Sequence, residues 1–172
     1  MEKNFIVVGN LNLVNDQMVI VTDPSYSVAQ HLNMTTKVKA GRYDALIEFK
    51  ETEFGDTVSR LAIIRENYDD AYLNPDNAII SCSVGVDSGT IGIFSHKYYD
   101  EIHSDKNVEK EWFDENVKDW VGILKYHLCN DFGIISNAGY GNGLYFVYVY
   151  ENKSGETIGI EVVFDVKANN EE

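Results

Sequence analysis

The sequence predicts an α+β fold that is predominantly β: an antiparallel β-sandwich or a strongly curved sheet, with one long helix packed on it. Short runs rich in Val, Ile, Tyr and Phe recur between clusters of turn residues along most of the chain. Within residues 42–51, apolar and polar residues alternate, so that Tyr43, Ala45 and Ile47 share one face. One stretch, about 108–128, departs from this pattern and has the apolar spacing of a helix.

The apolar runs place the strands in order along the chain. Asp23-Pro24 ends the second run, and Asn152-Lys153-Ser154-Gly155 indicates a hairpin turn before the last one. Residues 144–150 are apolar on both faces, which is typical of a strand in the middle of a sheet. We expect strands at residues 4–13, 18–22, 42–51, 57–65, 78–86, 90–94, 133–136, 144–151 and 156–166, with residues 37–39 leading into the strand at 42–51.

The long helix is predicted from one apolar stripe. Phe113, Val117, Trp120, Leu124 and Leu128 are separated by four, three, four and four residues, which puts them on one helical face. Acidic residues in the first turn and basic residues in the last turn suit the helix dipole. We therefore expect a helix over about 108–128, packed on the sheet through Phe113, Trp120 and Leu124, and a shorter helix around 96–102.

Length and composition predict one globular domain over residues 1–172. A chain of 172 residues suffices for one domain with a real core, and hydrophobic residues make up 44% of it. Residues 168–172 are expected to fray. The two cysteines, Cys82 and Cys129, are far apart and form no Cys-x-x-Cys pair, so we assign them neither a disulfide nor reactive chemistry.

The charge of the chain bears on its partners and its compartment. The net charge of −14 repels nucleic acid phosphates and anionic membranes, so we expect neither as a partner. An acidic surface suits a basic protein partner, although the same charge is also accounted for by solubility alone. No secretion signal is recognisable, and no window approaches the roughly 20 apolar residues that span a bilayer. The expected location is the cytoplasm.

Two acids stand at the ends of predicted strands. Asp23 follows the run at 18–22, and Asp87-Ser88-Gly89 interrupts the apolar run from Val84 to Phe94. Converging carboxylates of this kind can hold a divalent cation or act as acid and base. The favoured alternative is that each acid caps a turn by accepting backbone N–H bonds, because Asp prefers turns and no EF-hand spacing is present.

A glycine-rich segment, Gly139-Tyr140-Gly141-Asn142-Gly143, precedes the strand at 144–151. It lacks the spacing of a dinucleotide fingerprint and is followed by a strand rather than a helix, so a structural hairpin is favoured over ligand contacts by Tyr140 and Asn142. The four histidines show no zinc-type pairing, and no serine lies in a nucleophile elbow. We therefore name no catalytic residue, no metal ligand and no cofactor.

Several motifs occur together in one order. They are Thr22-Asp23-Pro24, Gly41-Arg42-Tyr43, Arg60-Leu61-Ala62, Gly85-Val86-Asp87-Ser88-Gly89 and the glycine-rich segment at 139–143. Over roughly residues 19–165 the chain resembles the bacterial and phage family called domain of unknown function 4241. The resemblance implies a single β-rich domain and brings no established activity. Asn142 stands where many relatives are expected to carry an acid, which weakens any function built on a carboxylate at that turn.

Two functions are compatible with these observations. The first is a non-enzymatic cytosolic factor that binds another protein, of the immunity, antitoxin-like or phage counter-defence type, and its acidic charge favours it. The alternative is a small-ligand or metal-binding domain, with an enzyme as its less favoured form. Its site would combine Asp23 and Asp87, with Ser88 and Gly89, and the 139–143 loop. A surface patch would support the first function, and a pocket containing acids with shifted pKa values would support the second.

Overall fold

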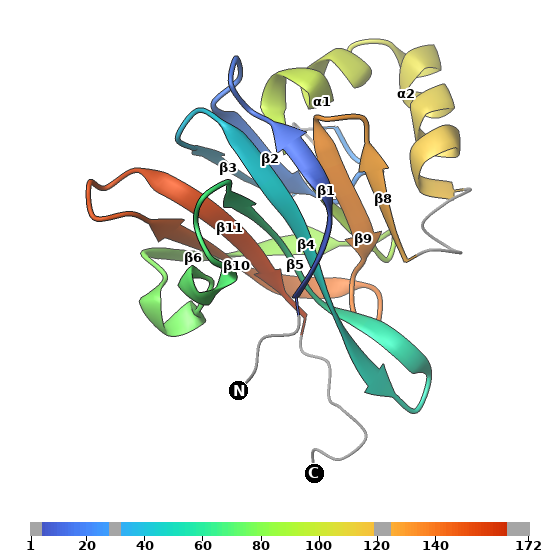
Figure 1. Ribbon diagram of the computed structural model, residues 1–172. Coiled ribbons are helices and arrows are strands. Elements are labelled where there is room, and N and C mark those ends of the chain that lie inside the picture. Colours follow the sequence, from blue (N-terminus) through green and yellow to red (C-terminus); the bar gives the residue numbers. More distant parts are fainter. Residues whose placement is uncertain (1–4, 28–31, 119–124, 165–172) are drawn as a thin grey trace.

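A computed structural model describes residues 5–27, 32–118 and 125–164 (Figure 1). The fold is α+β and predominantly β, as the sequence predicts, with two antiparallel sheets. The six-stranded sheet has the order β1 (Phe5–Asn12), β4 (Arg42–Thr52), β5 (Gly55–Arg65), β11 (Thr157–Val163), β10 (Gly143–Glu151), β6 (Ile80–Val86). The five-stranded sheet has the order β3 (Met34–Lys37), β2 (Met18–Thr22), β7 (Thr90–Ser95), β9 (Gly133–Asn137), β8 (Tyr126–Cys129).

The main hydrophobic core lies between the two sheets. Ile47, Ile63 and Ile160 of the six-stranded sheet are fully buried in one cluster with Val21 and Ile93 of the five-stranded sheet. Successive side chains of a strand point to opposite faces, so the alternation in residues 42–51 selects which face enters this core. Tyr43, Ala45 and Ile47 are all fully buried, which confirms their shared face.

The helices cover the other face of the five-stranded sheet (Figure 1). Helix α1 (His96–Ile102) is followed by α2 (Lys106–Phe113) and by a π-helical turn over Asp114–Lys118. Trp112 is 7% exposed and packs in one cluster with Phe94 of β7 and Tyr99 of α1. Its indole N–H donates to the Tyr98 hydroxyl at 2.9 Å, which satisfies the polar edge of a buried ring.

The prediction of one long helix over 108–128 is wrong. Helical structure is described only as far as Lys118, and Tyr126–Cys129 forms β8, which pairs with β9. Leu128 therefore lies on a strand and packs against the main core, and pairing with β9 outweighs the helical spacing of the apolar residues. Trp112 provides the buried aromatic contact, whereas Phe113 is only half-buried. Trp120, Leu124 and the tail at 168–172 lie outside the described residues.

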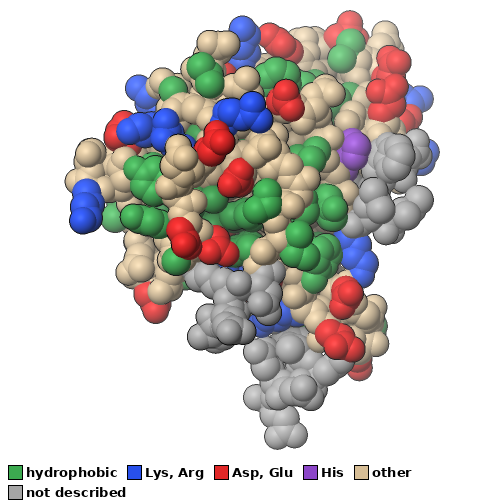
Figure 2. Space-filling view, viewed as in Figure 1, with side chains coloured by type: hydrophobic (Ala, Val, Ile, Leu, Met, Phe, Trp, Pro, Cys, Tyr) green, Lys and Arg blue, Asp and Glu red, His purple; other side chains and the backbone are tan. Residues whose placement is uncertain are grey.

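The outer face of the six-stranded sheet carries a smaller core under the segment that links β5 to β6. Leu73 of this segment packs with Leu46, Ala62 and Ile64, next to short 3-10 turns at Asp70–Tyr72 and Pro75–Asn77. Strand β10 lies between β11 and β6, as its apolar sequence predicts. Figure 2 shows hydrophobic side chains across the middle of the side on which β4 and β11 are seen in Figure 1.

A buried ionic network holds this outer face to the β5–β6 segment. Glu161 is fully buried, forms an ion pair with Arg60, and accepts a hydrogen bond of 2.6 Å from the Tyr150 hydroxyl. Arg60 also donates to the carbonyl of Leu73 at 2.8 Å. Because a buried carboxylate is costly unless it is paired, Arg60 and Tyr150 offset the cost of placing Glu161 under this segment.

Candidate functional site

Asp23 is the centre of a hydrogen-bonded cluster at one end of the sandwich. Its side chain is fully buried directly after β2. Oδ2 accepts from the backbone N–H groups of Asp87 and Ser88 at 2.8 and 2.7 Å. Oδ1 accepts from the N–H and hydroxyl of Ser25 at 2.9 and 2.6 Å, and from the Ser88 hydroxyl at 2.7 Å. Asp23 therefore joins the end of β2 to the turn between β6 and β7.

The electrostatics of Asp23 follow from this geometry. Burial alone raises the pKa of the carboxyl, but the hydrogen bonds from Ser25 and Ser88 outweigh it, so the pKa lies below its usual value. The carboxylate accepts five hydrogen bonds, which occupies the lone pairs that a cation would need. The arrangement fits the predicted turn-capping role and leaves Asp23 poorly suited to bind a metal.

Asp87 lies beside Asp23 but has the opposite environment. Its side chain is exposed, and Oδ2 accepts a hydrogen bond of 3.0 Å from the Tyr26 hydroxyl. This contact raises the pKa of the Tyr26 hydroxyl, because ionising the phenol next to a carboxylate is unfavourable. Tyr99, fully buried, donates its hydroxyl to the carbonyl of Tyr26 and so fixes the segment that follows β2. Asp87 is held in place at the surface.

The glycine-rich segment lies against the same turn. The N–H of Ala138 donates to the carbonyl of Gly89 at 2.9 Å, and a Cβ on Gly89 would lie 3.8 Å from Oδ1 of Asn142. The Tyr145 hydroxyl donates to the carbonyls of Ala138 and Gly141, at 2.9 and 2.5 Å, which fixes the shape of the loop. The structure thus brings Asp23, Asp87, Ser88 and Gly89 together, with Asn142 beside Gly89 and Tyr140 on the same loop.

Phe54 is a further surface residue at this end, and the sequence analysis missed it. The β4–β5 hairpin projects from the sandwich (Figure 1), and Phe54, in its two-residue turn, is 76% exposed. Its ring meets that of Tyr140 edge to face, with centroids 6.2 Å apart, and Tyr140 is 55% exposed. Gly55 has φ of +91°, a conformation that glycine adopts without strain and that this tight turn requires.

We call Phe54, Tyr140, Asn142 and Asp87, with the exposed acids Glu53 and Asp56 of the β4–β5 turn, the hairpin-end surface. Figure 2 shows acidic side chains gathered at the tip of the hairpin seen in Figure 1. Thr52 keeps the turn rigid, since its hydroxyl oxygen accepts from the N–H of Phe54 at 3.1 Å. The surface combines exposed aromatic rings with carboxylates on a rigid backbone.

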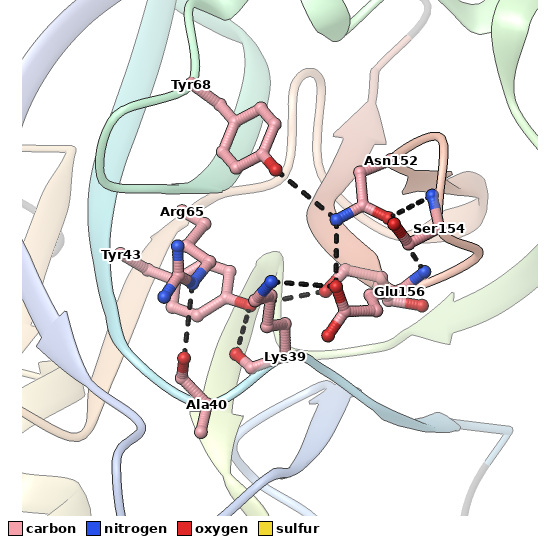
Figure 3. Close-up of polar contacts among 9 residues, drawn as sticks. Lys39, Ala40, Tyr43, Arg65, Tyr68, Asn152, Ser154 and Glu156 are labelled. Atoms are coloured by element: carbon pink, nitrogen blue, oxygen red, sulfur yellow. Dashed lines mark hydrogen bonds and ion pairs between the residues drawn. The ribbon is translucent and has the colours of Figure 1, made fainter.

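A second polar cluster lies near the turn between β10 and β11 (Figure 3). Lys39 donates to Oε1 of Glu156 at 2.7 Å, and the Asn152 amide donates to the same oxygen at 3.2 Å. Both contacts lower the pKa of the Glu156 carboxyl. Arg65 donates to the carbonyl of Ala40 at 3.2 Å. These side chains bond one another and tie the β10–β11 turn to the start of β4, which is a structural role.

Three further findings bear on the class of the protein. Among the described residues, no group of three or more His, Cys, Asp or Glu side chains is arranged to hold a metal ion. Within those same ranges, no helix has the length and apolar character needed to cross a membrane. Cys82 and Cys129 are both free thiols.

Comparisons with known proteins leave the chain without an assigned family. No protein-family model, no curated protein and no solved structure matches it.

Proposed function

We propose that the protein is a non-enzymatic binding factor and that the hairpin-end surface binds a basic protein partner. The observation that carries the proposal is the exposed pair of aromatic rings, Phe54 and Tyr140, on adjacent turns. Aromatic side chains supply much of the binding energy of protein interfaces, and large exposed apolar groups rimmed by polar ones mark interaction sites. An immunity, antitoxin-like or phage counter-defence role, in the cytoplasm, is the class of function that fits.

Charge supports a basic partner. Glu53 precedes Phe54 and Asp56 follows Gly55, with Lys125 donating to the Asp56 carbonyl. Asp87 lies on the turn that contacts the 139–143 loop. The net charge of the whole chain is −14, so the long-range electrostatic field of the protein also attracts a basic partner. Complementary charge steers partners together and discriminates against acidic competitors, while the aromatic rings supply contact area.

The alternative is a small-ligand or metal-binding site around Asp23, Asp87 and the 139–143 loop. What favours it is that these residues do converge. Against it, Asp23 is fully buried and accepts five hydrogen bonds from its neighbours. A ligand would have to displace these bonds, whereas a protein partner needs only the residues already exposed.

The proposal is tested by comparing what the wild-type protein and a paired variant capture from lysate of the native host. We expect Phe54→Ala combined with Tyr140→Ala to lower capture of a basic protein by about 30-fold or more, because truncating central interface aromatics costs about 2 kcal/mol or more. Val108→Ala is the matched control, since Val108 is an exposed apolar residue on α2. Glu53→Lys combined with Asp56→Lys should also weaken capture.

Equal capture by the wild type and the Phe54/Tyr140 variant would refute the proposed surface. Circular dichroism and thermal melts of each variant establish that the fold is unchanged. If a captured partner is acidic and is insensitive to the Glu53/Asp56 charge reversal, the assignment of a basic partner is wrong. Small-molecule binding that depends on Asp23 and Asp87 would instead support the alternative.

A further inference from the structure

A hollow of ≈ 630 Å³ lies where α1 meets α2, and Ser25, which donates to Asp23, forms part of its lining. Its lining includes Ser27, His103, Lys106, Lys110 and Phe113. The volume is in the range of sites that bind small molecules. Three features of its lining point to a ligand: a buried histidine without hydrogen bonds, two lysines without ion pairs, and an aromatic wall.

His103 is the first feature. Its side chain is 4% exposed, and neither ring nitrogen makes a hydrogen bond. Nδ1 lies 3.4 Å from Oε2 of Glu109, and the ring is tilted against that of Tyr99 at 4.2 Å between centroids. Nδ1 therefore faces the Glu109 carboxylate, whereas Nε2 has no partner among the described residues and is the atom that can bond a ligand in the hollow.

The state of the imidazole follows from its surroundings. Burial lowers its pKa, and the carboxylates of Glu109 on α2 and Asp100 on α1 oppose this shift only in part. The ring is therefore neutral near pH 7. A negative charge brought into the hollow would favour the protonated ring and raise its pKa.

The lysines are the second feature. Lys106 and Lys110 are four residues apart on α2 and so project from neighbouring positions on one helix face. Neither forms an ion pair within the described ranges, although the chain has 28 acidic residues and only 14 Lys and Arg. Two acids also line the hollow: Glu109, whose Oε2 lies 3.4 Å from Nδ1 of His103, and Asp114, which lies 3.9 Å from Lys118.

We propose that this hollow binds a phosphate-type oxyanion between Lys106 and Lys110, with the Ser27 hydroxyl as a further donor and His103 behind them. Lysine ammonium groups and hydroxyls are standard donors to phosphate oxygens. The hollow extends to Phe113, so an anion attached to an apolar or aromatic group fills it better than the free ion. The ligand class is a small phosphate monoester, with inorganic phosphate as the simplest member of the same chemistry. This proposal does not rest on the proposed protein-binding function.

The test is a titration of the full chain with inorganic phosphate and with phenyl phosphate, followed by NMR and calorimetry at constant ionic strength. We expect saturable binding of both, tighter for phenyl phosphate, and an upward shift of the His103 ring pKa on binding. Lys106→Gln combined with Lys110→Gln should weaken binding by about tenfold or more, since each lysine supplies a charge-assisted hydrogen bond. Lys97→Gln is the control, because Lys97 is exposed on α1 and does not line this hollow.

Three outcomes would overturn the proposal. They are the absence of saturable binding of either compound, equal weakening by Lys97→Gln and by the paired variant, and an unchanged His103 pKa at saturation. If inorganic phosphate binds as tightly as phenyl phosphate, the monoester assignment is wrong and the site is one for the free ion. His103→Gln is studied by the same phosphate titration and by a thermal melt. An unchanged melting temperature with weaker binding shows that the variant has lost binding and not its fold.

Discussion

Replacing Asp23 by Asn tests whether this acid holds two parts of the fold together. The substitution keeps the size of the side chain but replaces one carboxylate oxygen with an NH2 group and removes the charge. Asp23 faces donors only: two from Ser25, two from Ser88, and the N–H of Asp87. An amide placed there leaves at least one donor opposite another donor, whichever way it is turned.

The expected loss of stability is about 3 to 5 kcal/mol. A hydrogen bond to a charged group contributes about 1.5 to 3 kcal/mol, and the backbone donors of Asp87 and Ser88 share one oxygen of Asp23. Water reaches the turn because Asp87 and Ser88 are exposed, so the donors recover part of this energy and the five contributions do not add. The estimate is therefore well below the sum of five separate bonds.

Urea denaturation followed by fluorescence and circular dichroism measures the effect, with Asp87→Asn as the matched control. Asp87 lies in the same cluster but is exposed, and the replacement should change the free energy of unfolding by less than about 1 kcal/mol. Destabilisation of Asp23→Asn by less than about 1 kcal/mol, with an unchanged denaturant slope, would refute the structural role assigned to Asp23.

The same contacts make stability depend on pH. The pKa of Asp23 is lowered in the folded protein and ordinary in the unfolded chain, so its contribution is fully present above the ordinary value. The contribution is lost as the pH falls through the lowered folded pKa. Between about pH 5 and pH 2, the wild type should lose more stability than Asp23→Asn does. Parallel curves for the two proteins would contradict this linkage.

Four other measurements test the packing and the surface. Trp112→Ala should cost about 3 to 5 kcal/mol in urea denaturation, because the ring is 7% exposed in the α1–α2 cluster. Gly92→Ala should cost about 1 to 3 kcal/mol, since its Cβ would lie 2.2 Å from Cζ of the fully buried Phe94. Tyr150→Phe should cost about 1 to 3 kcal/mol by removing the 2.6 Å hydrogen bond to buried Glu161. The association rate with a captured basic partner should fall as salt rises, with a smaller change in dissociation, and a salt-independent rate would assign the net charge of −14 to solubility alone.

The strands could be predicted because their signals are local. The run of β2 ends at Asp23-Pro24 and the run of β7 begins after Asp87-Ser88-Gly89, and the structure begins and ends these strands within one residue of the predicted bounds. The convergence of Asp23 with Asp87 was also accessible from the sequence, since both follow or interrupt strands at a turn. The sequence did not show which of the two acids is buried. Burial of Asp23 depends on the N–H donors of Asp87 and Ser88, which are 64 and 65 residues away in the chain.

The prediction of a long helix over 108–128 is wrong for a physical reason. A spacing of three and four residues describes which side chains share a helical face, but it does not exclude an alternating strand at the end of the stretch. Tyr126 and Leu128 also alternate, and β9 offers them a hydrogen-bonding partner that a helix would leave open. Pairing of β8 with β9 therefore determined the structure of these residues, and the local apolar periodicity carries no information about that pairing.

The missed residues are those whose importance comes from distant contacts. Phe54 looks like an ordinary turn residue until Tyr140 is placed beside it. The alternation of side chains along β11 puts Glu161 on the outer face of the sheet, as expected for an acid. The segment around Leu73 nevertheless covers Glu161, and Arg60 neutralises its charge. His103 has no pairing motif, and only its burial without hydrogen bonds distinguishes it from the other histidines that the structure describes. None of these properties is encoded in residue spacing.

The buried Asp23 and the exposed rings of Phe54 and Tyr140 are connected through a chain of contacts. The carboxylate fixes the β6–β7 turn, the carbonyl of Gly89 in that turn accepts from the N–H of Ala138, and the loop that begins there carries Tyr140 to Phe54. A surface held in its binding geometry loses less conformational entropy when a partner binds. Asp23→Asn should therefore weaken partner binding even under conditions where the variant remains folded, although Asp23 itself touches no partner. Full affinity of folded Asp23→Asn would show that the two turns present their side chains independently.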